Sequence, residues 1–126
     1  ISFNGKWHTV YLDGKRKSSV EDTFSGFGSH PASVGSFTGM QKGFTGFIDE
    51  VSIWNSAIGK KDVEDIYNTH SPFDLNQHRR LGVLKAWYRM GDLQNDTGAK
   101  IFDVLGNFDA SSLQLNLSSI KLDTAN

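Results

Sequence analysis

The stretch from residue 44 to residue 54 constrains the fold most, because its apolar side chains recur with the period of an extended strand. In such a strand, one face carries Phe47, Asp49, Val51 and Ile53, and the other carries Ile48, Glu50, Ser52 and Trp54. Apolar groups on both faces predict a strand inside a two-layer sandwich, contacting the core on one side and a loop or neighbour on the other. Gly46 would let another backbone approach closely.

A hairpin is expected upstream of this stretch. Residues 7–12 have the aromatic and β-branched content of a strand, and they run into Asp13-Gly14, a strong two-residue turn signal. Residues 15–20 should return as its second strand, with Lys15, Arg16 and Lys17 as a solvated tip. Further short strands are expected near residues 32–37, 84–90, 101–104 and 113–117.

A short helix is expected downstream. Val63, Ile66 and Tyr67 fall at helical spacing, and carboxylates near the start favour the helix dipole. Ser56 or Gly59 can cap its beginning, and the sequence His70-Ser71-Pro72 ends it. Because such a short helix is unstable alone, we expect it to lie on the sandwich.

Composition supports an all-β chain and excludes several classes of partner. The 13 glycines, nine phenylalanines, three tryptophans and three tyrosines among 126 residues favour many short strands over long helices. A net charge of −1 provides no long-range field for nucleic acid or an anionic membrane surface. The chain has no cysteine, and no apolar run approaches the roughly 20 residues that span a membrane. It begins without methionine, so we expect a fragment of a larger protein.

The motifs resemble the laminin-G-like and pentraxin-like branch of the concanavalin-A-like jelly rolls. The resemblance rests on Phe44, Gly46, Ile48-Asp49-Glu50-Val51, Ile53-Trp54-Asn55 and Ile66-Tyr67-Asn68, and upstream on Trp7-His8 and Tyr11-Leu12-Asp13-Gly14. It implies an antiparallel β-sandwich with one short closing helix. The structural signature would be Gly46, Asp49, Glu50, Trp54 and Tyr67.

The second half is similar to domains in bacteriophage structural proteins. The similarity lies in Asp74-Leu75, Ala86-Trp87-Tyr88-Arg89-Met90-Gly91-Asp92 and Asp103-x-x-Gly106-Asn107. It implies that residues 1–70 are the C-terminal part of such a sandwich, that residues 71–83 are a linker, and that residues 84–126 add strands to the same or an adjoining sandwich. Two departures stand out. The family's strands before the Trp-His hairpin are missing here, and Gly59 stands where the family's helix begins with Ser.

Enzymatic activity is not expected. Glucan hydrolases of this superfamily take two carboxylates about 5 Å apart from one strand. Here Phe47 and Ser52 occupy the flanking acidic positions, and the adjacent Asp49 and Glu50 should point to opposite faces of the strand. We therefore assign no catalytic residue, and we interpret Asp49 as a buried structural carboxylate that binds neighbouring backbone donors.

Binding sites have weak candidates only. Asp92, Asn95 and Asp96 supply clustered oxygen atoms for a calcium ion, although turn-forming side chains explain them equally well. The four histidines are scattered and do not predict zinc. Trp54, Trp87 and Tyr88 can stack on sugar rings, although their strand pattern is more typical of a core.

The resulting prediction is a non-enzymatic virion module, such as a head-fibre, decoration or tail-fibre subunit, which binds other copies of itself or other virion proteins. The missing N-terminal strands suggest that a neighbouring copy completes the sandwich by strand addition. The alternative is a carbohydrate-binding adhesin of a secreted or cell-surface protein, calcium-assisted, whose partner is a host-surface glycan. Both place the chain on a virion surface or outside a cell.

Overall fold

The described part of the chain is mostly β-strand, arranged in small antiparallel sheets with one α-helix. The structure is a computed structural model, and it describes residues 1–22, 32–36, 43–93, 96–97 and 99–111. The strands are β1 (Ser2–Phe3), β2 (Trp7–Leu12), β3 (Lys15–Glu21), β4 (Val51–Trp54), β5 (Leu84–Tyr88), β6 (Lys100–Ile101) and β7 (Ala110–Ser111). Helix α1 spans Lys60–Tyr67, and the 3₁₀ turns η1 (Asn68–His70), η2 (Leu75–Gln77) and η3 (Leu81–Val83) lie between it and β5.

The predicted hairpin is confirmed. Strands β1, β2 and β3 form one antiparallel sheet in that order, and β2 and β3 are joined through Asp13 and Gly14, whose φ angles are 51° and 71°. Two consecutive positive φ angles define the tight turn that matches strand twist. The Thr9 and Ser19 hydroxyls are 2.9 Å apart across the two strands, which ties the middle of the hairpin together.

The predicted strand over residues 44–54 is shorter than expected. It is regular only in β4, which pairs antiparallel with β5, with Ser52 opposite Trp87. The extended backbone is interrupted at Glu50, whose φ is 51°, and the Glu50 N–H donates to the Asp49 carboxylate at 2.7 Å. This local turn ends the alternation on which the prediction rested. Likewise, the strand expected near residues 32–37 is described only as a single bridge between Ser36 and Gly43.

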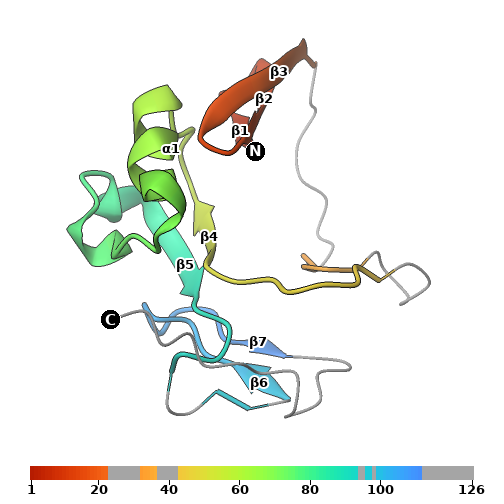
Figure 1. Cartoon of the computed structure of the whole chain (residues 1–126), viewed down its shortest axis with the longest axis vertical. Helices are drawn as coiled ribbons and strands as arrows, with labels where there is room; N and C mark the ends of the chain where they lie inside the picture. The colour runs from red at the N-terminus through yellow and green to blue at the C-terminus, as the bar shows by residue number, and fades with distance from the viewer. Residues whose placement is uncertain (23–31, 37–42, 94–95, 98, 112–126) are drawn as a thin grey trace.

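The predicted helix is confirmed, with Gly59 and not Ser56 at its N-cap. The Asp62 carboxylate accepts the Gly59 N–H at 2.8 Å, which satisfies one of the donors left open at a helix start. At the other end, Asn68 adopts the left-handed conformation that closes many helices. In Figure 1, α1 lies next to the β1–β2–β3 sheet, and the two touch where the Tyr67 ring packs on Gly14.

The core gathers around β5, near the middle of Figure 1. One buried cluster contains Leu75, Leu84 and Trp87, and a second contains Ala86, Tyr88 and Ile101. The alternation expected over residues 84–90 therefore fails at Trp87, which is buried together with both of its neighbours in β5. Because β5 pairs with β4, the regions before and after the helix share one sheet.

Residues 71–83, which the sequence predicts as a linker, include buried side chains. Leu75 and His78 are both buried, with 3% and 4% of their surfaces exposed. The His78 ring contacts the Trp54 and Phe73 rings edge-on, with centroids 5.2 and 5.8 Å away. This segment therefore packs between the helix and β5 as part of the core.

The last sheet pairs β6 with β7, so the strand expected near residues 101–104 is only two residues long. The strand expected near residues 113–117 lies outside the described residues. Among the described helices, none has the length and apolar character needed to cross a membrane.

Candidate functional site

A cluster of polar side chains lies where β4 and β5 meet. The Glu50 cluster consists of Glu50, Trp87, Arg89 and Asp92. The Trp87 indole donates to Glu50 Oε2 at 2.6 Å, and Arg89 Nε donates to Glu50 Oε1 at 3.2 Å. Arg89 also donates to the Asp92 carboxylate at 2.5 Å, and its guanidinium lies 5.6 Å from the centre of the Trp87 ring. The guanidinium therefore links two carboxylates and stacks on the indole.

Burial raises the pKa of the Glu50 carboxyl above its ordinary value of 4.5. The indole of Trp87 and the Arg89 guanidinium oppose that shift because they stabilise the ionised form, but they do not outweigh it. An acid with a raised pKa is a common feature of catalytic sites. Here, however, both of its oxygens are bound to neighbouring side chains. The arrangement is therefore that of a structural link between two strands.

The predicted burial of Asp49 is wrong, because the residue is exposed, while its structural role stays a prediction. Its carboxylate accepts the N–H of the next residue, and its backbone lies just before β4. Of the other signature positions, Gly46 approaches a ring and not a backbone, because a Cβ built there would lie 2.7 Å from the Phe44 side chain. Tyr67 packs on the hairpin turn at Gly14.

The aromatic residues considered for sugar binding are mostly buried. Trp87 is 3% exposed and Tyr88 is 8% exposed, so neither presents an open ring face on which a sugar could stack. Trp54 is half-buried, and its indole N–H donates to the Ser52 hydroxyl at 3.0 Å. Trp54 lines a groove that has a volume of about 220 Å³ and lies between α1 and the first sheet.

The calcium candidates have other partners. Asp92 is bound to Arg89, and Asp96 accepts the N–H groups of Gly91 and Phe102, both at 2.8 Å. Asn95 lies outside the described residues. Within the described ranges, no group of three histidine or acidic side chains has the arrangement needed to hold a metal ion. Asp96 acts here as a turn former, which was the competing interpretation of these residues.

Asp103 organises a loop beside β5. It is 4% exposed, and its two carboxylate oxygens accept four backbone N–H groups. The donors are Trp87, Leu105, Asn107 and Phe108, at 2.8, 3.1, 3.0 and 3.1 Å. Sequence reasoning assigned this residue no role, although the D-x-x-G-N spacing was a usable signal, because an aspartate before a glycine-containing turn often binds turn backbone.

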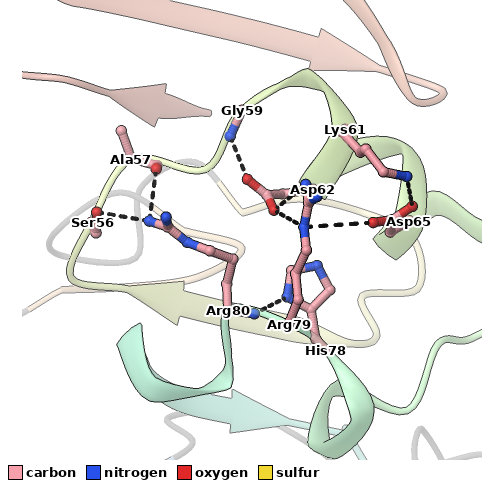
Figure 2. A network of polar contacts seen from close by, with 9 residues as sticks. All are labelled: Ser56, Ala57, Gly59, Lys61, Asp62, Asp65, His78, Arg79 and Arg80. Carbon is pink, nitrogen blue, oxygen red and sulfur yellow. Dashed lines mark hydrogen bonds and ion pairs between the residues drawn. The ribbon is translucent and has the colours of Figure 1, made fainter.

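A second polar network fastens residues 78–80 to the start of α1, as Figure 2 shows. Arg79 binds the Asp62 carboxylate at 2.7 Å, and Arg80 donates to the Ser56 hydroxyl at 2.9 Å. The Nδ1 atom of buried His78 accepts the Arg80 N–H at 3.1 Å. This network, which no sequence pattern indicated, explains why the segment predicted as a linker packs closely against the helix.

The described surface also carries large apolar side chains. They lie at the start and in the strands of the β1–β2–β3 sheet, between residues 34 and 53, in η3, and between β6 and β7: Ile1, Trp7, Val10, Leu12, Val20, Val34, Phe44, Phe47, Ile53, Leu81 and Phe108. Contiguous exposed apolar groups commonly mark contact surfaces. Among the described residues, these surfaces are better candidates for function than any polar cluster.

Comparison of the chain with protein-family models, with curated proteins and with solved structures finds no match.

Proposed function

We propose that this chain is a non-enzymatic structural module of a virion, of the head-fibre, decoration or tail-fibre kind, that works by self-association and surface attachment. Its fold would be a concanavalin-A-like jelly roll. The observation that carries this proposal is the open outer edge of β4.

The edge of β4 is suited to accept another strand. One side of β4 pairs with β5, and no other described strand pairs with its second side. The four residues of β4, Val51–Trp54, include no charged side chain, and Ile53 is 45% exposed. Natural proteins usually protect such edges with lysine, proline or a covering segment, because an open apolar edge pairs readily with another chain.

The opposite side of β5 is already occupied, so β4 is the side on which the sheet can grow. The Val104 N–H donates to the Trp87 carbonyl at 2.9 Å, and the Trp87 N–H donates to Asp103 at 2.8 Å. A strand from a neighbouring copy or another virion protein would add beside β4 and extend this sheet.

The virion assignment is supported by the order of motifs. The resemblance to bacteriophage structural domains lies in Asp74-Leu75, in residues 86–92 and in Asp103-x-x-Gly106-Asn107, and this run follows the helix α1 of the laminin-G-like motif as it does in that group. The proposal therefore has two parts, an assembly mechanism and a location, and each needs its own experiment.

Sedimentation velocity over a range of concentrations tests the mechanism. We expect the unmodified chain to form species larger than a monomer. Ile53→Lys should weaken this association because it places a charge on the β4 edge, whereas Lys85→Gln on the exposed side of β5 should not. An unmodified chain that stays monomeric at every concentration would refute self-association.

Immunogold electron microscopy of the source material tests the location. An antibody raised against this chain should place gold on capsids or tails. Labelled cells or free filaments beside bare virions would overturn the virion assignment and favour a secreted adhesin.

A further inference from the structure

The first sheet has one face that the rest of the described chain leaves open. Its outer strip consists of Val10, Leu12 and Val20, which are 37%, 57% and 62% exposed. All three lie on the same side of the sheet. Alternation along β2 places His8, Val10 and Leu12 on one face, and Val20 of β3 joins them because it pairs with His8. The Phe3 ring stacks on His8 at 4.3 Å and extends the strip toward β1.

The other face of this sheet is already used. Ser2 and Tyr11 line the groove of about 220 Å³ together with residues of β4 and α1, and Thr9 and Ser19 on that side are half-buried. Among the described residues, the inner face is thus partly covered, although Trp7 on that side is 38% exposed, whereas the outer strip is open. A valine or leucine side chain that leaves water and becomes buried is stabilised by the hydrophobic effect, so covering the strip is favourable.

Charges at the two ends of the sheet indicate what covers it. The hairpin tip carries Lys15, Arg16 and Lys17 against the single carboxylate of Asp13. The opposite end carries Glu21 and Asp22 against Lys6, which binds Glu21 at 3.0 Å. Lys15 and Asp22 belong to the outer face, because Lys15 lies opposite Leu12 and Asp22 binds His8 at 3.2 Å. The outer face therefore has a basic end and an acidic end.

We infer that the outer strip is an interface with a second copy of this chain, packed face to face about a two-fold axis with its strands running in the opposite direction. That arrangement places the basic tip of each copy over the acidic end of the other, and it makes the same patch serve both partners. The inference rests on the proposed function of self-association and assigns it a second surface.

Pairing through the edge of β3 is disfavoured in comparison. Lys15, Arg16 and Lys17 occupy nearly half of that strand, and lysine-rich edges prevent edge-to-edge pairing. The face, and not the edge, is therefore the contact in this part of the molecule, whereas β4 contributes an edge.

Val20→Lys tests the strip, and Val34→Lys is its matched control because Val34 is 52% exposed outside the sheet. Measured by sedimentation velocity, Val20→Lys should raise the dimer Kd about 100-fold, since it places an unpaired charge in the interface. Val34→Lys should leave the Kd unchanged. Circular dichroism establishes that both variants are folded.

Charge reversal provides a test that remains valid if Val20→Lys does not fold. One variant carries Lys15→Glu and Lys17→Glu, and the other carries Glu21→Lys and Asp22→Lys. Each variant alone should stay monomeric at this interface, because like charges face each other, while an equimolar mixture should associate. In the mixture, both ends of the pair carry opposite charges.

The outcomes separate this inference from the proposed function. A monomeric unmodified chain would refute self-association altogether. The outer-strip interface alone would be refuted by a different result. In that result the unmodified chain associates, Val20→Lys associates equally well, and the charge-reversed mixture associates no more than either variant alone. In that case the β4 edge remains the contact.

Discussion

At the scale of single residues, two carboxylates do most to shape the region around β5. Asp103 collects four backbone N–H groups on one buried side chain, and Glu50 joins an indole to a guanidinium. Glu50, just before β4, binds side chains 37 and 39 residues away, whereas Asp103 binds the Trp87 N–H 16 residues away and three N–H groups of its own loop. Their effects on stability should differ. Asp103 is buried among backbone donors, whereas Glu50 is only partly removed from water and has a raised pKa.

Asp103→Ala should be among the most destabilising substitutions in the described chain. It removes the acceptor for four N–H groups and leaves buried donors unsatisfied, so we expect a loss of about 3–5 kcal/mol in the free energy of unfolding. Urea denaturation measures this loss. Asp13→Asn is the control, because Asp13 is exposed in a turn that asparagine also adopts. A loss equal to that of the control would show that the loop does not depend on Asp103.

Glu50→Gln should change how stability depends on pH. The pKa of Glu50 is raised in the folded chain, mainly by burial, so its protonated form is favoured by folding. Its contribution is fully present below the ordinary value of 4.5 and is lost as pH rises through the higher folded pKa. Glutamine does not titrate and still accepts from the Trp87 indole. Relative to the unmodified chain, the variant should therefore gain stability as pH rises above 4.5, as followed by urea denaturation at several pH values.

At the scale of elements, the hairpin and the helix could be predicted because their signals are local. Asp13-Gly14 indicates the turn, and the spacing of Val63, Ile66 and Tyr67 indicates the helix, although contacts with distant residues stabilise the helix once it forms. The start of β4 and the packing of residues 71–83 could not be predicted from local signals. Glu50 is held by partners 37 and 39 residues away, and the burial of Leu75 depends on β5. The candidate site could not be predicted locally for the same reason. Trp87 is buried because β4 pairs with one side of its strand and the loop at Asp103 and Val104 binds the other.

The start of α1 should depend on Asp62. Burial acts to raise the pKa of this carboxyl, but the Gly59 N–H and the Arg79 guanidinium outweigh it and hold the pKa below its usual value. Its stabilisation is therefore present above the ordinary value of 3.8 and is lost as pH falls through the depressed pKa. Asp62→Ala should cost about 1–2 kcal/mol at neutral pH, the usual range for a lost cap. Asp65→Ala removes ion pairs but no cap, so it should cost less. Urea or thermal denaturation of both variants measures the two losses.

The contact between the hairpin and the helix can be tested with two glycines. Gly14 and Gly106 both have a φ of +71°, but a Cβ on Gly14 would lie 2.8 Å from the Tyr67 ring, whereas nothing lies within 4 Å of one on Gly106. Alanine at either position costs about 1–2 kcal/mol of backbone strain. Gly14→Ala should cost a further 1–3 kcal/mol or so from overpacking. In a double variant that carries both Gly14→Ala and Tyr67→Ala, this additional cost should disappear. Equal losses of stability for Gly14→Ala and Gly106→Ala would contradict the contact between the hairpin and the helix.

At the scale of the whole molecule, the described part of the chain buries few apolar residues. Within the described ranges, six hydrophobic residues are buried, and eleven large hydrophobic residues are exposed. A small core gives little stability by itself, so chains of this kind depend on association or on other stabilising contacts. Both proposed contacts, the β4 edge and the outer strip, would bury apolar surface that the single chain leaves in water.

Association of this kind makes stability depend on protein concentration. If only the folded chain associates, a tenfold increase in concentration stabilises the folded state by up to about 1.4 kcal/mol per dimer. The midpoint of thermal unfolding should therefore rise with concentration in the unmodified chain. A variant with both Ile53→Lys and Val20→Lys should lose most of that dependence, because each substitution places a charge in one contact. Differential scanning calorimetry at several concentrations measures the effect. A midpoint that does not change with concentration in the unmodified chain would show that the monomer supplies its own stability and that the exposed apolar side chains serve another purpose.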